Sequence, residues 1–138
     1  MMLVFGDGVI EWARLRMPLQ SGFDMPYGFG VMNPQTGVLM CAVVFDNYRP
    51  LSKSVCVSLA IDDKRGFTRG LLRAVSHYAF IQLGCNRITA MIDCNNKRSL
   101  DVTRRVGFVE EGVMREQSPA GGDMIVFGML KRECKWLS

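Results

Sequence analysis

A short basic turn with two glycines carries the clearest chemical signal in the sequence. Lys64, Arg65 and Arg69 surround Gly66 and Gly70, between an apolar run and a helical pattern. The first turn of a helix has backbone N–H groups without intrahelical partners, and the helix dipole adds about half a positive charge there. Glycine lets an anion approach the backbone closely. We therefore expect residues 62–71 to bind an anion such as a phosphate group.

The segments on either side of this turn predict a strand followed by a helix. Residues 55–61 alternate between large apolar and smaller side chains, which is typical of a strand with one fully buried face. Apolar residues recur at helical spacing over 69–83, and Gly84 is typical of a helix end. A second polar stretch follows an expected strand over 86–93. There Asn96 and Ser99 open an expected short helix over 97–106.

Both stretches resemble motifs of the GNAT family of N-acetyltransferases. Residues 65–70, Arg-Gly-Phe-Thr-Arg-Gly, are similar to the family's pyrophosphate-binding signature Q/R-x-x-G-x-G/A, except that Thr68 replaces the usual middle glycine. Residues 96–108 resemble the later motif, in which an asparagine opens a helix that ends in Leu-Gly-Phe. Asn-x-x-Ser, Gly-Phe and the following Glu111-Gly112 are closest to the branch of ribosomal-protein N-terminal acetyltransferases. The resemblance covers roughly residues 27 to 131.

The order of the expected elements agrees with the fold that the resemblance implies. The sequence predicts the α/β class, with a strand near residues 3–5, a helix over 8–17 capped by Asp7, a hairpin over 29–45, a strand–helix–strand unit over 54–93 and a final hairpin over 108–131. We expect residues 1–138 to form a single domain with a mixed, mostly antiparallel sheet. The resemblance implies a central pair of parallel strands that splay apart, with flanking helices, and an acceptor cleft lined by the loop 18–27.

The resemblance also implies the cosubstrate, acetyl-CoA, and the residues that bind it. Its pantetheine arm would pair with the first splayed strand like an extra strand, and its pyrophosphate would lie on the turn. Glycines at 66 and 70 would let the phosphates reach the backbone. The cofactor-binding residues implied in this way are Leu59, Ala60, Ile61, Arg65, Gly66, Phe67, Thr68, Arg69, Gly70, Leu71 and Asn96.

Direct attack of an amine on the thioester is the chemistry that the resemblance implies. The family often uses as general acid a tyrosine four residues before the Gly-Phe glycine, a position that Thr103 occupies here. Ser99 matches a serine of the ribosomal-protein branch and is the candidate general acid instead. The general base stays unassigned, with Asp46, Glu110 and Glu111 as open alternatives.

Composition narrows the remaining classes of function. The net charge of +4 suits an anionic cosubstrate, and the basic residues lack the interleaved aromatics that favour nucleic acid. No apolar run is long enough for a membrane span, and the N-terminus has no basic leader. Five cysteines without a C-x-x-C pair predict free thiols in the cytoplasm, and the single histidine, His77, predicts no metal site.

The sequence therefore favours an acetyl-CoA-dependent N-acetyltransferase that acts on a primary amine. A protein N-terminus, a lysine or a small amine is the expected acceptor. The alternative is a catalytically impaired protein of the same fold, which binds coenzyme A or a partner without turnover, because Thr68 and Thr103 both depart from the family pattern. A homodimer is an assembly that the sequence leaves open.

Overall fold

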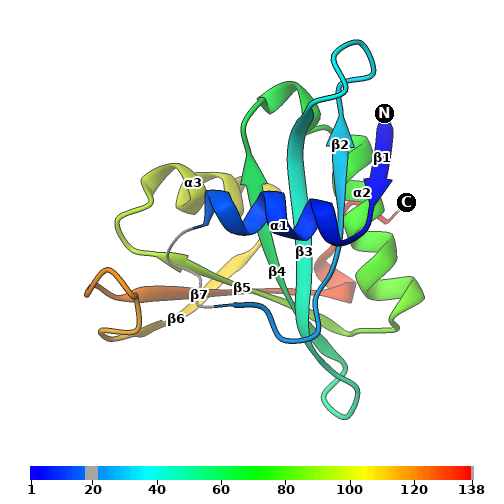
Figure 1. Ribbon diagram of the computed structural model, residues 1–138. Helices are drawn as coiled ribbons and strands as arrows, with labels where there is room; N and C mark the ends of the chain where they lie inside the picture. The colour runs from blue at the N-terminus through cyan, green and yellow to red at the C-terminus, as the bar shows by residue number, and fades with distance from the viewer. Residues whose placement is uncertain (18–21, 138) are drawn as a thin grey trace.

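A seven-stranded mixed sheet organises the computed structural model, which describes residues 1–17 and 22–137 (Figure 1). The strand order is β1-β2-β3-β4-β5-β7-β6. The strands are β1 (Met2–Phe5), β2 (Tyr27–Met32), β3 (Leu39–Arg49), β4 (Ser54–Ile61), β5 (Arg87–Asp93), β6 (Val109–Met114) and β7 (Met124–Leu130). The helices are α1 (Asp7–Arg16), η1 (Lys64–Gly66), α2 (Arg69–His77), η2 (Tyr78–Gln82), α3 (Lys97–Val106) and η3 (Lys131–Glu133).

Strand pairing confirms the predicted α/β class and its mixed sheet. Strands β1 to β4 form an antiparallel meander, and β7 pairs antiparallel with both β5 and β6. Only β4 and β5 run parallel, and they pair over just three positions, from Ser54–Arg87 to Cys56–Thr89. Beyond Cys56 the two strands separate, as the resemblance implied.

The two faces of the sheet carry different helices. On one face, α2 packs on the main core, where Leu71 and Phe80 join Phe45 and Ile88. A smaller cluster around Leu100 places α3 on the same face. Leu100 packs on Phe127 of β7, and Phe127 is two residues from Met129 of the main core, so both side chains point to the same side of the sheet. On the opposite face, α1 packs on Ala42, Val44 and Ala60 of β3 and β4, and it crosses in front of these strands in Figure 1.

Three local expectations need correction. Residues 57, 59 and 61 of β4 are half-buried rather than fully buried, since β5 no longer covers that edge. The predicted helix over 69–83 is α-helical only to His77 and continues as one wide π turn before Gly84, whose φ is +71°. Asp7 is the first residue of α1 rather than its cap, and the preceding Gly6 provides no side-chain bond.

The C-terminal tail and the loop after α1 complete the described fold. After β7, the tail returns to the main core, where Trp136 Nε1 donates a hydrogen bond to the Val106 carbonyl at 2.9 Å. The loop expected over 18–27 is described only from residue 22, so residues 18–21 lie outside the described part. None of the described helices is long and apolar enough to cross a membrane.

Candidate functional site

The gap between β4 and β5 creates a free strand edge in the middle of the sheet. Leu59, Ala60 and Ile61 pair with β3 on one side and have no β5 partner on the other. In a strand, every second residue turns its N–H and C=O toward a given edge. The exposed stretch of β4 can therefore accept an extended ligand as an additional strand, which is what the prediction for these three residues requires.

The first half of the following turn is held tightly to the sheet. The N–H groups of Asp62 and Asp63 both donate to the Met40 carbonyl at 2.9 Å. Asp63 then accepts the Arg65 N–H at 3.0 Å and the Arg65 guanidinium at 2.6 Å. These bonds lower the pKa of Asp63 to about 2. Phe67 closes η1 and packs its side chain on the main core.

The pairing of Arg65 with Asp63 could not be expected from the family signature alone. The pairing directs the side chain of Arg65, the first residue of the signature, back toward Asp63. The Arg65 side chain nevertheless remains mostly exposed. A carboxylate two residues before an arginine is the sequence signal that would have suggested it. The assignment of Arg65 to the pyrophosphate stays a prediction, and it requires the side chain to exchange one anionic partner for another.

The second half of the turn forms the N-terminus of α2. Thr68 is the N-cap, and its Oγ1 accepts the Leu71 N–H at 3.2 Å. The cap therefore uses one of the N–H groups assigned to the pyrophosphate. The N–H groups of Arg69 and Gly70 lie in the first turn, where no intrahelical acceptor exists. They are the groups of this turn that an anion can bind, and the exposed Arg69 side chain adds a full positive charge.

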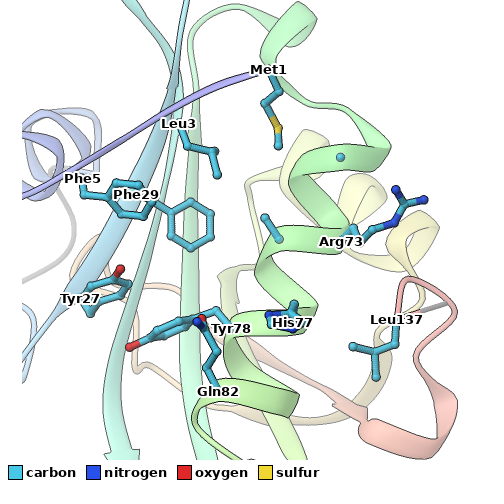
Figure 2. A pocket seen from close by; sticks show the side chains of 12 residues that line it. Met1, Leu3, Phe5, Tyr27, Phe29, Arg73, His77, Tyr78, Gln82 and Leu137 are labelled. Carbon is cyan, nitrogen blue, oxygen red and sulfur yellow. The ribbon is translucent and has the colours of Figure 1, made fainter.

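The methionine at position 1 also contacts this helix start. Its Sδ lies 3.9 Å from Thr68 Oγ1, and its Sδ and Cε would lie 3.4 Å from a Cβ built on Gly70. Figure 2 shows the Met1 side chain above the first turn of α2. A ligand that binds over Gly70 must share this space with a flexible side chain, which can change its rotamer.

On the β5 side of the gap, α3 begins with a second capped N-terminus. Asn96 Oδ1 accepts the Ser99 N–H at 3.2 Å, and its amide NH2 group points away from this bond with two donors to offer. Ser99 is half-buried, and its carbonyl accepts the Thr103 hydroxyl at 2.7 Å. The structure thus places Asn96 and Ser99 beside each other at the end of β5, as their predicted roles require.

The three candidate carboxylates have different surroundings. Glu111 forms a two-pronged ion pair with Arg87, at 2.6 and 3.0 Å, which lowers the pKa of Glu111. Glu110 pairs with Arg104 at 3.0 Å. Asp46 is half-buried on β3 and accepts one backbone N–H, from Asp24, at 3.2 Å; burial raises its pKa.

A separate apolar pocket of about 490 Å³ lies along the outer side of α2 (Figure 2). Its lining comes from β1, β2, α2, the turn that follows it and the C-terminal tail, and it includes His77. Tyr27 and Tyr78 stack there with ring centroids 4.6 Å apart. Of the turn residues 62–71, Gly70 alone lines this pocket, and Met1 lies beside it.

The fold and the turn together define a class of protein. A splayed parallel strand pair beside a glycine-bearing helix start is the arrangement that the motifs of the sequence implied. The acetyltransferase (GNAT) domain profile matches residues 8–109. The chain belongs to the GNAT acetyltransferase family, which confirms the resemblance.

Two curated relatives are named as N-acetyltransferases, one of them as a putative ribosomal N-acetyltransferase. The chain is 32% identical over 72 residues to the uncharacterized N-acetyltransferase p20 of Bacillus licheniformis, and 33% identical over 72 residues to the putative ribosomal N-acetyltransferase YdaF of Bacillus subtilis (strain 168). Each match covers 50% of this chain. The chain spans about 40% of the length of these relatives.

Solved structures support the fold over nearly the whole chain. A mutant of the spermidine N-acetyltransferase SpeG from Vibrio cholerae superposes with a TM-score of 0.78 at 17% identity, covering 100% of this chain and 98% of that one. A probable acetyltransferase superposes with a TM-score of 0.69 at 23% identity, covering 92% and 71%. At these identities the likeness concerns the fold.

Proposed function

We propose that this protein transfers an acetyl group from acetyl-CoA to a primary amine by direct attack of the amine on the thioester. The observation that carries the proposal is the free edge of β4 next to the N-terminus of α2. The edge offers backbone partners to the pantetheine arm, and the N–H groups of Arg69 and Gly70 offer a site to the pyrophosphate.

The β5 side of the gap supplies the remaining groups of the proposed site. The Asn96 amide would hold the pantetheine arm from the end of β5, and the neighbouring Ser99 hydroxyl would protonate the leaving thiolate. An N–H of residues 59–61 would stabilise the oxyanion. Holding the thioester and the amine together lowers the entropic part of the barrier.

The finer features of the proposal concern the acceptor and the setting. The acceptor is a protein N-terminus, a lysine or a small amine, supported by the named relatives and by the fold shared with spermidine N-acetyltransferase. All five cysteines lie unpaired in the described residues, which supports a reducing cytoplasmic setting. Residues 1–138 would act as one domain, alone or as a homodimer.

A second candidate is a protein that binds coenzyme A without turnover. Thr103 occupies the position of the usual tyrosine, and its hydroxyl donates a hydrogen bond to the Ser99 carbonyl within α3. This favours the second candidate unless Ser99 itself supplies the proton. Turnover, rather than binding, distinguishes the two candidates.

The test combines a thermal melt with a thiol-release assay on the same sample. Acetyl-CoA at about 100 times its Kd adds roughly 2.7 kcal/mol, a shift of several degrees for a domain of this size. Thiol release is then followed with a peptide carrying a free N-terminus, a lysine peptide with a blocked N-terminus, and spermidine. A melt shift with thiol release from any of the three supports the transferase. A shift without release supports the binder, and no shift rejects both.

The role of Ser99 has its own prediction. Ser99→Ala should lower kcat by about 10²-fold or more if the hydroxyl is the general acid. The acetyl-CoA melt shift should stay unchanged, because the Asn96 cap uses the backbone N–H of residue 99 and not its hydroxyl. A variant with wild-type kcat would show that the thiolate leaves without help from this serine.

A further inference from the structure

One carboxylate lies beside the apex of the opening between β4 and β5. Asp46 on β3 pairs across with Cys56, and Cys56 is the last residue of β4 that pairs with β5. Residues 43 and 45 face the main core, whereas residues 42 and 44 face α1. By this alternation Asp46 lies on the α1 face of the sheet.

The α1 face is the side from which a second substrate can reach the opening. Both α2 and α3 pack on the other face, and the turn and cap that suit acetyl-CoA stand at their N-termini. An amine must then approach from the side on which Asp46 lies. Asp46 is diagonal to Ser58 on the free stretch of β4, which corresponds to roughly 7–8 Å between Cα atoms.

The other carboxylates near the opening already have charged or tight partners. Glu111 is clamped by Arg87 over Gly128, and Glu110 pairs with Arg104. Asp93, at the far end of β5, accepts the hydroxyl of the buried Ser118. Among the described residues, Asp46 is a half-buried carboxylate of this face without an ion-pair partner, and unlike Asp93 it accepts no side-chain hydroxyl.

The surroundings of Asp46 suit a group that receives a cation and then a proton. Burial and the nearby charge of Asp24 raise its pKa, which brings it closer to neutral pH. The Cys56 thiol faces it from β4, and burial raises the pKa of that thiol as well. The positive charges of Arg87 on β5 and Arg49 at the end of β3 lower the pKa of Cys56 and so partly offset the effect of burial. A substrate ammonium would give Asp46 the positive partner that it lacks.

We propose that Asp46 binds the ammonium of the acceptor and removes its proton, directly or across one water molecule. This inference rests on the proposed function. The N–H bond of the ammonium breaks and the proton goes to the carboxylate. The freed lone pair forms the C–N bond, and as the C–S bond breaks the thiolate takes the proton of the general acid. The nitrogen of the new amide loses its second proton, which restores the general acid. Asp46 then returns its proton to the solvent.

The test compares Asp46→Asn with Asp101→Asn in the thiol-release assay. Asparagine keeps the shape of the side chain and can still accept the Asp24 N–H, so the fold should be retained. We expect kcat/KM for the amine to fall by about 10² to 10⁴-fold in Asp46→Asn. The acetyl-CoA melt shift should stay as in the wild type. Asp101→Asn, which removes an exposed ion pair with Arg105, should leave kcat/KM nearly unchanged.

The pH profile separates proton transfer from a merely structural role. In the wild type, kcat/KM should rise with pH through the pKa of Asp46 and then level. In Asp46→Asn it should keep rising through the pKa of the acceptor amine, and Asp46→Glu should restore the wild-type shape. Wild-type kcat/KM in Asp46→Asn, or a loss without any change in the pH profile, would overturn the inference. A wild-type protein with a melt shift but no thiol release would refute the proposed transfer, and this inference with it.

Discussion

The two glycines of the β4–α2 turn are four residues apart and are required for different reasons. A Cβ on Gly66 would lie 2.8 Å from Met40 Cβ and 3.1 Å from Cys41 Sγ, so this buried residue can only be glycine if the turn is to pack on β3. A Cβ on Gly70 would meet the flexible end of Met1 at 3.4 Å and Thr68 Oγ1 at 3.6 Å, both ordinary van der Waals contacts. The fold needs the first glycine, whereas the second lies where we propose that the pyrophosphate binds.

This difference divides the turn into two halves. Residues 62–67 are fixed by Met40, by the Asp63–Arg65 pair and by the side chain of Phe67. Residues 68–71 form a helix start in which the N–H groups of Arg69 and Gly70 have no intrahelical acceptor. The signature thus contains a structural part and a part that we propose binds the phosphates, and substitutions in the two parts should have separable effects.

The largest expected effect is on cofactor binding. Gly70→Glu should abolish acetyl-CoA binding, because the side chain fills the space over the helix start and its charge repels the pyrophosphate. Isothermal titration should show no heat of binding, while the free energy of unfolding changes little. Unchanged affinity in this variant would contradict the assignment of the phosphate site.

The next largest effect is on stability. Gly66→Ala should lower the free energy of unfolding by about 1–3 kcal/mol, since Met40 Cβ leaves no room for another methyl group. Denaturant melts measure this directly. Gly70→Ala is the matched control and should be neutral or slightly stabilising, because alanine favours helix more than glycine does. Equal losses in the two variants would remove the distinction between the halves of the turn.

The cap at Thr68 should have an intermediate effect on stability. Thr68→Ala removes the acceptor of the Leu71 N–H and should cost about 1 kcal/mol. Thr68→Ser keeps the oxygen and should recover most of that loss. Denaturant melts of the two variants would decide the point, and identical midpoints for alanine and serine would show that the cap contributes nothing.

The smallest expected effect concerns the Asp63–Arg65 pair. The pKa of Asp63 is lowered from 3.8 to about 2, so its contribution to stability is present above pH 4 and is lost as pH falls toward 2. Asp63→Asn should therefore be slightly less stable than the wild type at neutral pH. Melts at several pH values should show the two proteins converging near pH 2. A difference that does not depend on pH would mean that the ion pair is not its source.

The periodicity of the sequence was sufficient to predict most of the fold. The strand over 55–61, the helix from Arg69 and the hairpins follow from local patterns, and the resemblance added the splayed pair. The end of α2 was harder to predict, because apolar spacing is compatible with both an α-helix and a wide turn at Tyr78–Gln82. The half-burial of β4 depends on where β5 diverges, which is a property of the tertiary structure.

The elements that form the candidate site were predictable from the sequence, but the contacts between them were not. The motif located the turn and the two helix starts, whereas nothing local indicated that Met1 would lie over Gly70. The three open carboxylates could not be distinguished by sequence, because the partners of Glu111 and Asp46 lie far along the chain. Arg87 neutralises Glu111 across 24 residues, and Asp24 approaches Asp46 across 22.

Hydrogen exchange with and without acetyl-CoA tests the central claim most directly. Cofactor binding should slow the exchange of amides in residues 57–61 of β4 and in residues 69–71 at the start of α2. The stacked tyrosines of the outer pocket, Tyr27 and Tyr78, should show no change in exchange at their amides. Protection around that pocket alone, or no protection anywhere at saturating acetyl-CoA, would contradict a cofactor site between β4 and β5.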